Sequence, residues 1–219
     1  MPQLFTPRSN GIARLLIAGA LVLIIGGAVA GLMLNISPYN TGQHAVVSQP
    51  VPFSHRHHVG ELDIRCGYCH TSFERSTFAG LPDTTTCMTC HSQLWTNADV
   101  LAPVRESLAQ NKPLRWSRVH DLPDYVYFSH QAHVNNGVGC ESCHGRVDQM
   151  PLTRQAKPLT MRWCLECHRD PGPHLRAEQQ ITTMGYPHSK AASQASAVQL
   201  LKEYNIRTER MTECVTCHR

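Results

Sequence analysis

The chain has 219 residues, of which 42% are apolar but only 6% aromatic, and it contains 14 Gly, 14 Pro and 10 Cys. Its 20 Lys and Arg against 16 Asp and Glu give a formal charge of +4, and the basic residues are scattered without a block, so no nucleic-acid partner is indicated. A chain so poor in large aromatic side chains is not expected to build an ordinary core from its own residues alone.

The first predicted element is an apolar run, Leu15–Leu34, which contains no charged residue. Twenty residues at helical rise span the hydrocarbon core of a bilayer. Two arginines and no acidic residue precede the run, which predicts a cytoplasmic N-terminus at 1–14 and a chain on the outer, periplasmic side after Asn35. The competing interpretation is a cleaved signal peptide with Ala28-Val29-Ala30 as the cleavage site, but signal peptides have apolar runs of only about 7 to 15 residues. We therefore predict a single-pass anchor in the cytoplasmic membrane.

All ten cysteines lie in five copies of the pattern Cys-x-x-Cys-His, which follow a predicted linker at 35–52. The copies are Cys66/Cys69/His70, Cys87/Cys90/His91, Cys140/Cys143/His144, Cys164/Cys167/His168 and Cys214/Cys217/His218. This spacing lets two thiols form thioethers with the vinyl groups of one haem while the following His binds its iron. Zinc ribbons or disulfides would need neither an odd number of pairs nor a His after the second Cys. The pattern predicts five covalently bound haem c groups, attached outside the cytoplasm, which form the core of a mostly irregular and α-helical fold with almost no sheet.

A second repeat accompanies the motifs. Phe53–Val59 is echoed by Phe128–Val134, and each copy is followed by one motif and, 21 or 24 residues later, by another. The repeat predicts a first dihaem module with a connecting segment at 53–127 and a second module at 128–185. A terminal helix and the fifth motif would occupy 186–219. Short helices are expected at Pro103–Gln110 and, with Ser189 as N-cap, at Ser189–Tyr204, the second of them amphipathic.

The repeats also contain the best candidates for second axial ligands. Residues three apart in a helical turn share a face, so His55 with His58, and His130 with His133, can each offer imidazoles to two irons. His44 and His57 are read instead as solvated or hydrogen-bonded side chains. The fifth distal ligand stays open: the His candidates are His174, His188 and His120, and the Met candidates are Met150, Met161, Met184 and Met211.

Nine His lie outside the motifs, enough to fill both axial positions of five irons. A filled coordination sphere leaves no place for a substrate, so these residues indicate electron transfer rather than catalysis at iron. The chain is therefore not expected to be an enzyme by itself. An enzyme that reduces nitrite or a related oxyanion would need an open iron, and no divergent motif marks one.

Two stretches resemble a known family: Trp116–Gly145, which contains the second His pair, and Pro158–Arg169 around the fourth motif. Together they resemble the pentahaem cytochrome c subunit (ActA) of bacterial alternative complex III, and the resemblance covers roughly 53–219 as well as the anchor. It implies a subunit of a quinol:electron-acceptor oxidoreductase. In that complex a membrane-integral subunit and an iron-sulfur subunit oxidise quinol, and the cytochrome passes electrons to a monohaem cytochrome c or a terminal oxidase.

The two-repeat arrangement is also similar to the cytochrome c7/c3 class. In that class the first His of each pair serves the haem nearest in sequence, which implies His55 for the haem of His70 and His130 for that of His144. The alternative is a quinol dehydrogenase of the NapC/NrfH kind that acts alone. That family has four haems and places the first close behind its helix, whereas 31 residues separate Leu34 from Cys66 here.

Overall fold

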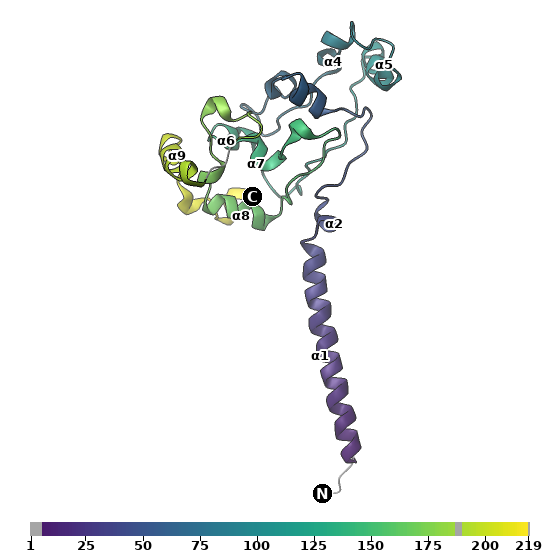
Figure 1. Cartoon of the computed structure of the whole chain (residues 1–219), viewed down its shortest axis with the longest axis vertical. Coiled ribbons are helices and arrows are strands. Elements are labelled where there is room, and N and C mark those ends of the chain that lie inside the picture. The colour runs from purple at the N-terminus through teal and green to yellow at the C-terminus, as the bar shows by residue number, and fades with distance from the viewer. Residues whose placement is uncertain (1–5, 187–189, 219) are drawn as a thin grey trace. The chain divides into compact units, whose positions relative to one another are not determined.

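A computed structural model describes residues 6–186 and 190–218, which form two compact units, 1–42 and 43–219 (Figure 1). We describe each unit by itself.

The first unit is a long helix followed by one short turn of helix. Helix α1 spans Pro7–Asn35 and α2 spans Pro38–Thr41, after which Gly42 adopts a left-handed φ of 67°. The helix thus begins eight residues before the predicted Leu15–Leu34, because Pro7 lies in its first turn, where a missing N–H costs nothing. It is long and apolar enough to cross a membrane, and none of its apolar window is buried.

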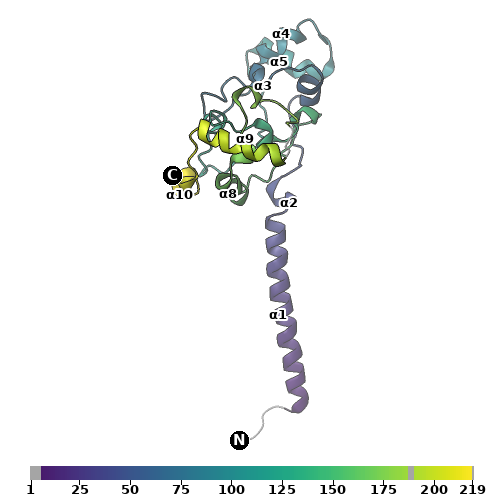
Figure 2. The same ribbon diagram turned by 60° about the vertical axis from the view of Figure 1, so that its left-hand side comes forward.

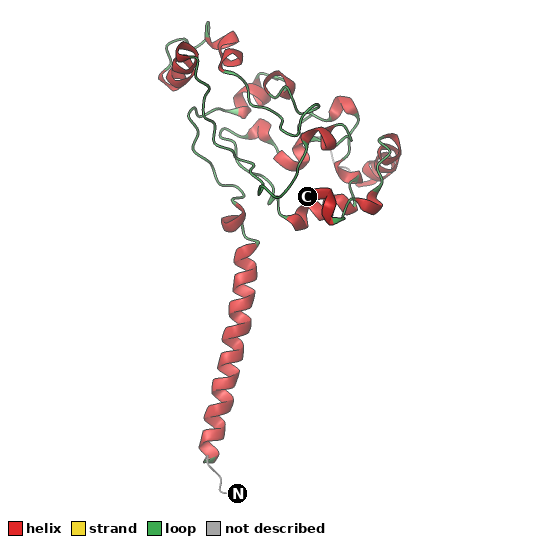
Figure 3. Cartoon of the chain, turned by 180° about the vertical axis from the view of Figure 1, so that it is seen from behind, coloured by secondary structure: helices red, strands yellow, loops and turns green. Residues whose placement is uncertain are grey.

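The second unit consists of short helices and irregular connections. Helices are the only regular elements in the described part of the chain, apart from two isolated bridges, Val46 with Arg154 and Val138 with Leu175 (Figure 3). The α-helices of this unit are α3 (Cys66–Cys69), α4 (Thr84–His91), α5 (Ala102–Gln110), α6 (His130–Val134), α7 (Cys140–His144), α8 (Met161–Arg169), α9 (Lys190–Glu203) and α10 (Cys214–Cys217). A π-helical turn, η1 (Arg56–Glu61), and five short 3-10 turns complete it: η2 (Asp99–Leu101), η3 (Val147–Gln149), η4 (Gly172–His174), η5 (Glu178–Gln180) and η6 (Thr208–Arg210). The predicted helical and irregular fold is confirmed.

Few apolar side chains are buried in this unit. One small cluster is formed by Val51, Leu101 and Val104, with Met88 and Trp116 packed against it. The only described side chain that is less than 2% exposed is that of Arg176, a charged residue. Such a thin core fits a fold whose interior is completed by prosthetic groups rather than by side chains.

The segment expected to be a linker is divided between the two units. From Gln43 onward it is attached to the second unit: the Gln43 side chain donates to the Ala156 carbonyl at 2.8 Å, and the His44 N–H donates to the Gln155 carbonyl at 2.8 Å. Val51 is buried in the small apolar cluster. The second unit therefore starts about ten residues before Phe53, where the sequence repeat begins.

Both helices predicted beyond the motifs are present. Helix α5 has Pro103 in its first turn and ends at Asn111, whose φ is 51°. Helix α9, seen at the front in Figure 2, places Ala197 and Leu201 against Gly172 of η4. The proposed N-cap, Ser189, lies outside the described residues.

Candidate haem-binding site

Each Cys-x-x-Cys-His motif lies on its own short helix. The helices are α3, α4, α7, α8 and α10, and the single turn is closed by a backbone bond such as that from the His70 N–H to the Cys66 carbonyl at 2.8 Å. All ten cysteines are free thiols. Burial raises the pKa of the Cys143 thiol to about 12 and that of Cys140 to about 11. A thiol held neutral in this way suits a thioether better than a metal thiolate.

Four pairs of imidazole rings face each other across similar gaps. Their ring centroids are separated as follows: His55 and His70 by 6.4 Å, His58 and His91 by 6.2 Å, His130 and His144 by 6.2 Å, and His133 and His168 by 6.1 Å. An imidazole nitrogen binds a metal at roughly 2 Å, and the ring centroid lies about 1.1 Å behind that nitrogen, so two rings on opposite sides of one metal are about 6 Å apart. Every gap therefore has the size of one iron with two axial imidazoles. The two His residues on either side of each gap thus fit the axial ligands of one haem iron.

The orientation of these rings is fixed by hydrogen bonds at their outer nitrogens. In seven of the eight rings Nδ1 is hydrogen-bonded to an oxygen at 2.7 to 3.2 Å. In six of them Nδ1–H donates to a carbonyl, of Gly80, Leu94, Met211, Ser54, Thr77 or Ser129, and His55 is bonded to the hydroxyl of Thr153. A proton fixed on Nδ1 leaves the Nε2 lone pair for a metal. Sequence analysis missed these acceptors, although Ser54 and Ser129 belong to the Phe-Ser-His repeat and could have been found there.

Each sequence repeat supplies one ring to each of two gaps. His55 and His58 flank the gaps of the first and second motifs, and His130 and His133 those of the third and fourth. The first pair begins the π-helical turn η1, whereas the second lies on α6, which Ser129 caps. His57, between the first two, instead bonds Glu61 at 2.9 Å.

Burial keeps several of these imidazoles neutral. It lowers the pKa of His144 to about 3 and that of His55 to about 4, and it also lowers the pKa of His133. A His must be unprotonated to bind a metal, so this effect favours the ligand state at neutral pH.

Contacts between motifs place them in an order that differs from the sequence. The first and second are joined by the hydrogen bond from Tyr68 to Thr89 at 2.7 Å. The first and third lie close together: the Cys66 thiol approaches the Thr182 carbonyl at 4.0 Å, and Arg176 of the same segment bonds Glu141 of the third motif at 3.3 Å. In addition to burial, Cys164 and Cys167 raise the pKa of Cys143, which joins the third motif to the fourth, and Cys217 raises that of Cys164, which joins the fourth to the fifth. The spatial order of the motifs is second, first, third, fourth, fifth.

The fifth motif is held differently. His218 Nδ1 donates to the Tyr125 carbonyl at 3.0 Å, and the Tyr127 N–H donates to the Cys217 carbonyl at 2.9 Å, so α10 docks on the connection between the two modules. The nearest described ring is that of Tyr125, at 5.7 Å and tilted by 34°. In the described part of the chain, His218 has no facing imidazole of the kind seen at the other four motifs.

The candidates for the fifth distal ligand occupy different places. His188 lies outside the described residues. His174 ends η4, where its carbonyl accepts the Gly139 N–H at 3.1 Å, and its ligand role stays a prediction. His120 lies against His144, at 4.4 Å between ring centroids, and so belongs to the third motif rather than the fifth.

The Met candidates gain no support as ligands from their positions. Met161 is 62% exposed, and Met150 is buried with its carbonyl bonded to the Arg56 N–H. Met184 borders the cavity that contains Cys66. Met211 uses its backbone carbonyl to orient His168, a role that the sequence did not indicate.

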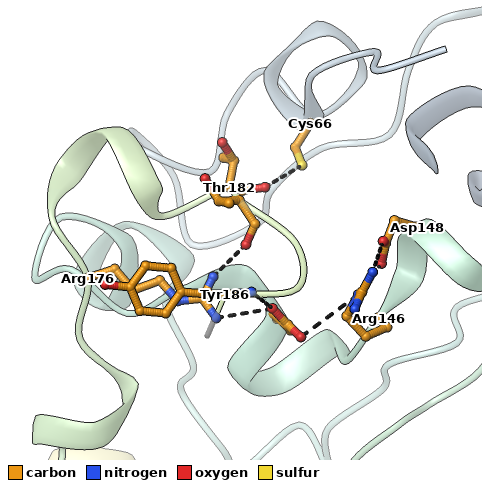
Figure 4. A network of polar contacts seen from close by, with 8 residues as sticks. Cys66, Arg146, Asp148, Arg176, Thr182 and Tyr186 are labelled. Atoms are coloured by element: carbon orange, nitrogen blue, oxygen red, sulfur yellow. Dashed lines mark hydrogen bonds and ion pairs between the residues drawn. The ribbon is translucent and has the colours of Figure 1, made fainter. Parts of the chain in front are cut away.

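A buried ionic network fixes the third motif (Figure 4). Glu141, inside that motif, accepts from the guanidinium of Arg176 at 3.3 Å and from the Tyr186 N–H at 3.2 Å. The guanidinium of Arg176 also donates to the Thr183 carbonyl at 2.6 Å and lies 4.7 Å from the Tyr186 ring. On its other side this segment meets the first motif, where the Cys66 thiol approaches the Thr182 carbonyl at 4.0 Å. Residues 176–186 therefore lie between the first and third motifs.

Among the residues that the structure describes, three buried polar atoms have no hydrogen-bond partner: His120 Nε2, Ser142 Oγ and Arg176 Nε. Ser142 is part of the third motif and the other two side chains contact that motif. An unsatisfied buried polar atom costs about 1–3 kcal/mol. Haem carboxylates are acceptors of the right kind, and a cavity of about 1210 Å³ bordered by Cys66, Arg65 and Arg75 lies near the first motif.

Known proteins support the same conclusion. Residues 132–219 match the cytochrome c3 family. Over 163 residues the chain is 31% identical to a protein of Nitratidesulfovibrio vulgaris named menaquinone reductase, multiheme cytochrome c subunit, a match that covers 65% of this chain and 78% of that protein. The chain belongs to the multihaem cytochromes c. Membership of this family implies covalently bound haem c, and the predicted cytochrome c3-like class is confirmed. The narrower resemblance to alternative complex III stays a prediction.

Proposed function

We propose that this multihaem cytochrome is a membrane-anchored pentahaem subunit that relays electrons within a quinol-linked oxidoreductase complex. The observation on which the proposal rests is the set of four facing imidazole pairs, each with a gap that fits one iron. In this proposal the proximal ligands of the five irons are His70, His91, His144, His168 and His218. The distal ligands of the first four irons, in the same order, are His55, His58, His130 and His133. His188 and His174 are the candidates for the fifth.

A haem supplies a carrier for one electron at a time. At the first four haems the chain's own residues exclude chemistry at iron, because imidazoles on both sides of an iron leave no position for a substrate. They also hold the rings still, since the outer nitrogens are tied to oxygens of the surrounding chain. A site that keeps its geometry when its charge changes is suited to rapid electron transfer.

The order of the motifs suggests a path with two ends. The second and fifth motifs are terminal in that order, and they contain the two exposed cysteines, Cys90 and Cys214. Electrons would enter and leave at these ends, because transfer to another protein needs a haem edge near the surface.

The membrane and the partners follow from two further observations. Helix α1 has an apolar surface with no partner in its own unit, which favours a place in a bilayer beside other membrane helices. The charge pattern of the sequence predicts a cytoplasmic N-terminus and haems on the outer side.

The relative is named as a subunit of a menaquinone reductase, whereas alternative complex III oxidises quinol. Both readings have a membrane-integral quinone-binding partner, and they differ in the direction of electron flow. In the second reading the other partners are an iron-sulfur subunit and a cytochrome c or oxidase.

Two experiments test the proposal. The haem content of the purified chain, measured from its pyridine haemochrome spectrum and its mass, should be five per chain. In membranes that contain the whole complex the haems should exchange electrons with the quinone pool, by reduction with added quinol or reoxidation with added quinone, whereas neither should react with the isolated chain. Turnover by the isolated chain would overturn the subunit role and support a quinol dehydrogenase that acts alone.

A further inference from the structure

The imidazole of His120, at the centre of the motif order, belongs to none of the four facing pairs. His120 lies in the irregular connection between α5 and α6, and a two-way pair of hydrogen bonds between Gln49 and the Ser117 backbone, at 2.8 and 2.9 Å, holds that connection. Its ring is close enough to interact electrostatically with the rings of His55, His130 and His144. His120 therefore lies where the first gap and the third gap meet.

The geometry excludes His120 as an axial partner of its nearest neighbour. Its ring centroid is 4.4 Å from that of His144 at an angle of 72°, an edge-to-face contact with no room for an iron between the rings. The opposite side of His144 is already taken by His130, at 6.2 Å. Contact of this kind instead limits how far the His144 ring can rotate.

His144 also differs from the other seven paired imidazoles. Hydrogen bonds from Nδ1 to an oxygen orient those seven, and in the described part of the chain none is found for His144. The described contact on the His144 ring is instead the edge-to-face packing of His120. At the same time Nε2 of His120 is buried and has no hydrogen-bond partner among the described residues. A buried imidazole N–H needs an acceptor, and the carboxylates of the two adjoining haems are the acceptors that the polypeptide itself does not provide.

We propose that His120 is a positioning residue at the contact between the first and third haems: its ring orients His144, and its buried Nε2–H donates to a carboxylate of one of those haems. The inference rests on the proposed ligand assignment. It assigns His120 a function apart from the fifth axial position, for which the sequence left it a candidate.

Two substitutions separate the two parts of this role. His120→Phe keeps an aromatic ring against His144 but removes the N–H. A hydrogen bond to a carboxylate offsets negative charge near the iron, so its loss should lower the reduction potential of the first or third haem and leave the other haems unchanged. His120→Ala also removes the ring, and it should in addition change the electron paramagnetic resonance signal of the third haem, which depends on the angle between its two imidazoles.

The matched control is His57→Phe. His57 also lies edge-on to a proposed ligand, with its centroid 5.3 Å from that of His58, but it is 42% exposed and already paired with Glu61. This variant should have unchanged potentials and spectra. A redox titration followed by visible and paramagnetic resonance spectra, on the full chain with its five haems, measures all three variants.

Each other outcome has a definite meaning. A new high-spin haem in His120→Phe would identify His120 as an axial ligand and overturn the inference. Unchanged potentials in His120→Phe would overturn the hydrogen bond, and an unchanged resonance signal in His120→Ala would overturn the positioning role. A parallel His130→Ala variant tests the ligand assignment itself. If the spectra of all five haems stayed unchanged in it, the proposed ligands of the third haem would be wrong, whatever His120 does.

Discussion

The two sequence repeats share their Phe, Ser, paired His and Val residues but have different surroundings. In the first, His58 faces His91 at a motif whose Cys90 is exposed, at one end of the motif order. In the second, His130 and His133 serve motifs that are interior to that order, and burial there raises the pKa of Cys143 to about 12. One ligand pattern thus serves a pair of sites that includes a terminal one and a pair of sites that are both interior. The pattern selects the ligands, whereas the surrounding loops decide how deeply each site is buried.

The largest expected effect comes from removing an attachment thiol at a central motif, in comparison with the same change at a terminal motif. Cys143→Ser should leave the third haem poorly attached and reduce the yield of folded chain, because its motif lies near both the first and the fourth, whose cysteines act electrostatically on Cys140 and Cys143. The matched variant Cys90→Ser should lose one haem at most and still fold, since the second motif has a neighbour on one side only. Haem content per chain and the yield of soluble protein measure both. Equal yields would show that burial of the motif does not matter.

Loss of a distal ligand should affect a single haem in either repeat. His133→Ala and His58→Ala should each convert one of five low-spin haems to a high-spin or Met-ligated form while all haems stay attached. The physical reason is that each ring faces only one motif His, at 6.1 and 6.2 Å. Visible and paramagnetic resonance spectra of the oxidised protein measure the change. If spectra of all five haems were unchanged, these two residues would not be ligands.

The ionic network offers a smaller test of the same contrast. Glu141→Gln leaves the guanidinium of Arg176, which is 1% exposed, without its carboxylate partner, and should lower the free energy of unfolding by roughly 3 kcal/mol. The control is Glu166→Gln, which removes a surface ion pair between Glu166, 59% exposed, and Arg162, 82% exposed. This substitution should change the free energy of unfolding by less than about 0.5 kcal/mol. Denaturant unfolding followed by the haem spectrum measures both. Similar effects of the two substitutions would contradict a special role for the buried pair.

The smallest expected effect concerns ring angles. The imidazoles of the first gap are nearly parallel, at 4°, whereas those of the second gap are inclined by 65°. Strongly inclined axial rings make the iron d orbitals more nearly equal in energy, so the second haem should have the largest principal g value. The His58→Ala variant identifies its signal, because that signal alone should disappear.

Much of this organisation could be predicted from the sequence because it depends on local spacing. The Cys-x-x-Cys-His pattern and the His pairs three residues apart each fit in one turn of helix, and the apolar run of α1 depends on composition alone. The contacts that orient the ligands depend on chain segments far apart. Thr77 accepts from His130, 53 residues away, and Met211 from His168, 43 residues away, and no local pattern indicates either.

The order of the motifs could not be predicted for the same reason. The first motif adjoins the third because residues 176–186, anchored by Arg176, lie between them. A buried arginine in a loop has no sequence signature.

The most direct test of the central claim, that imidazoles bind iron on both sides, is near-infrared magnetic circular dichroism of the oxidised, full-length protein. The position of the charge-transfer bands identifies the axial ligands of each low-spin haem. We predict five haems per chain, at least four of them with two imidazoles. A spectrum with fewer than four such haems, or a protein without covalent haem, would contradict the claim.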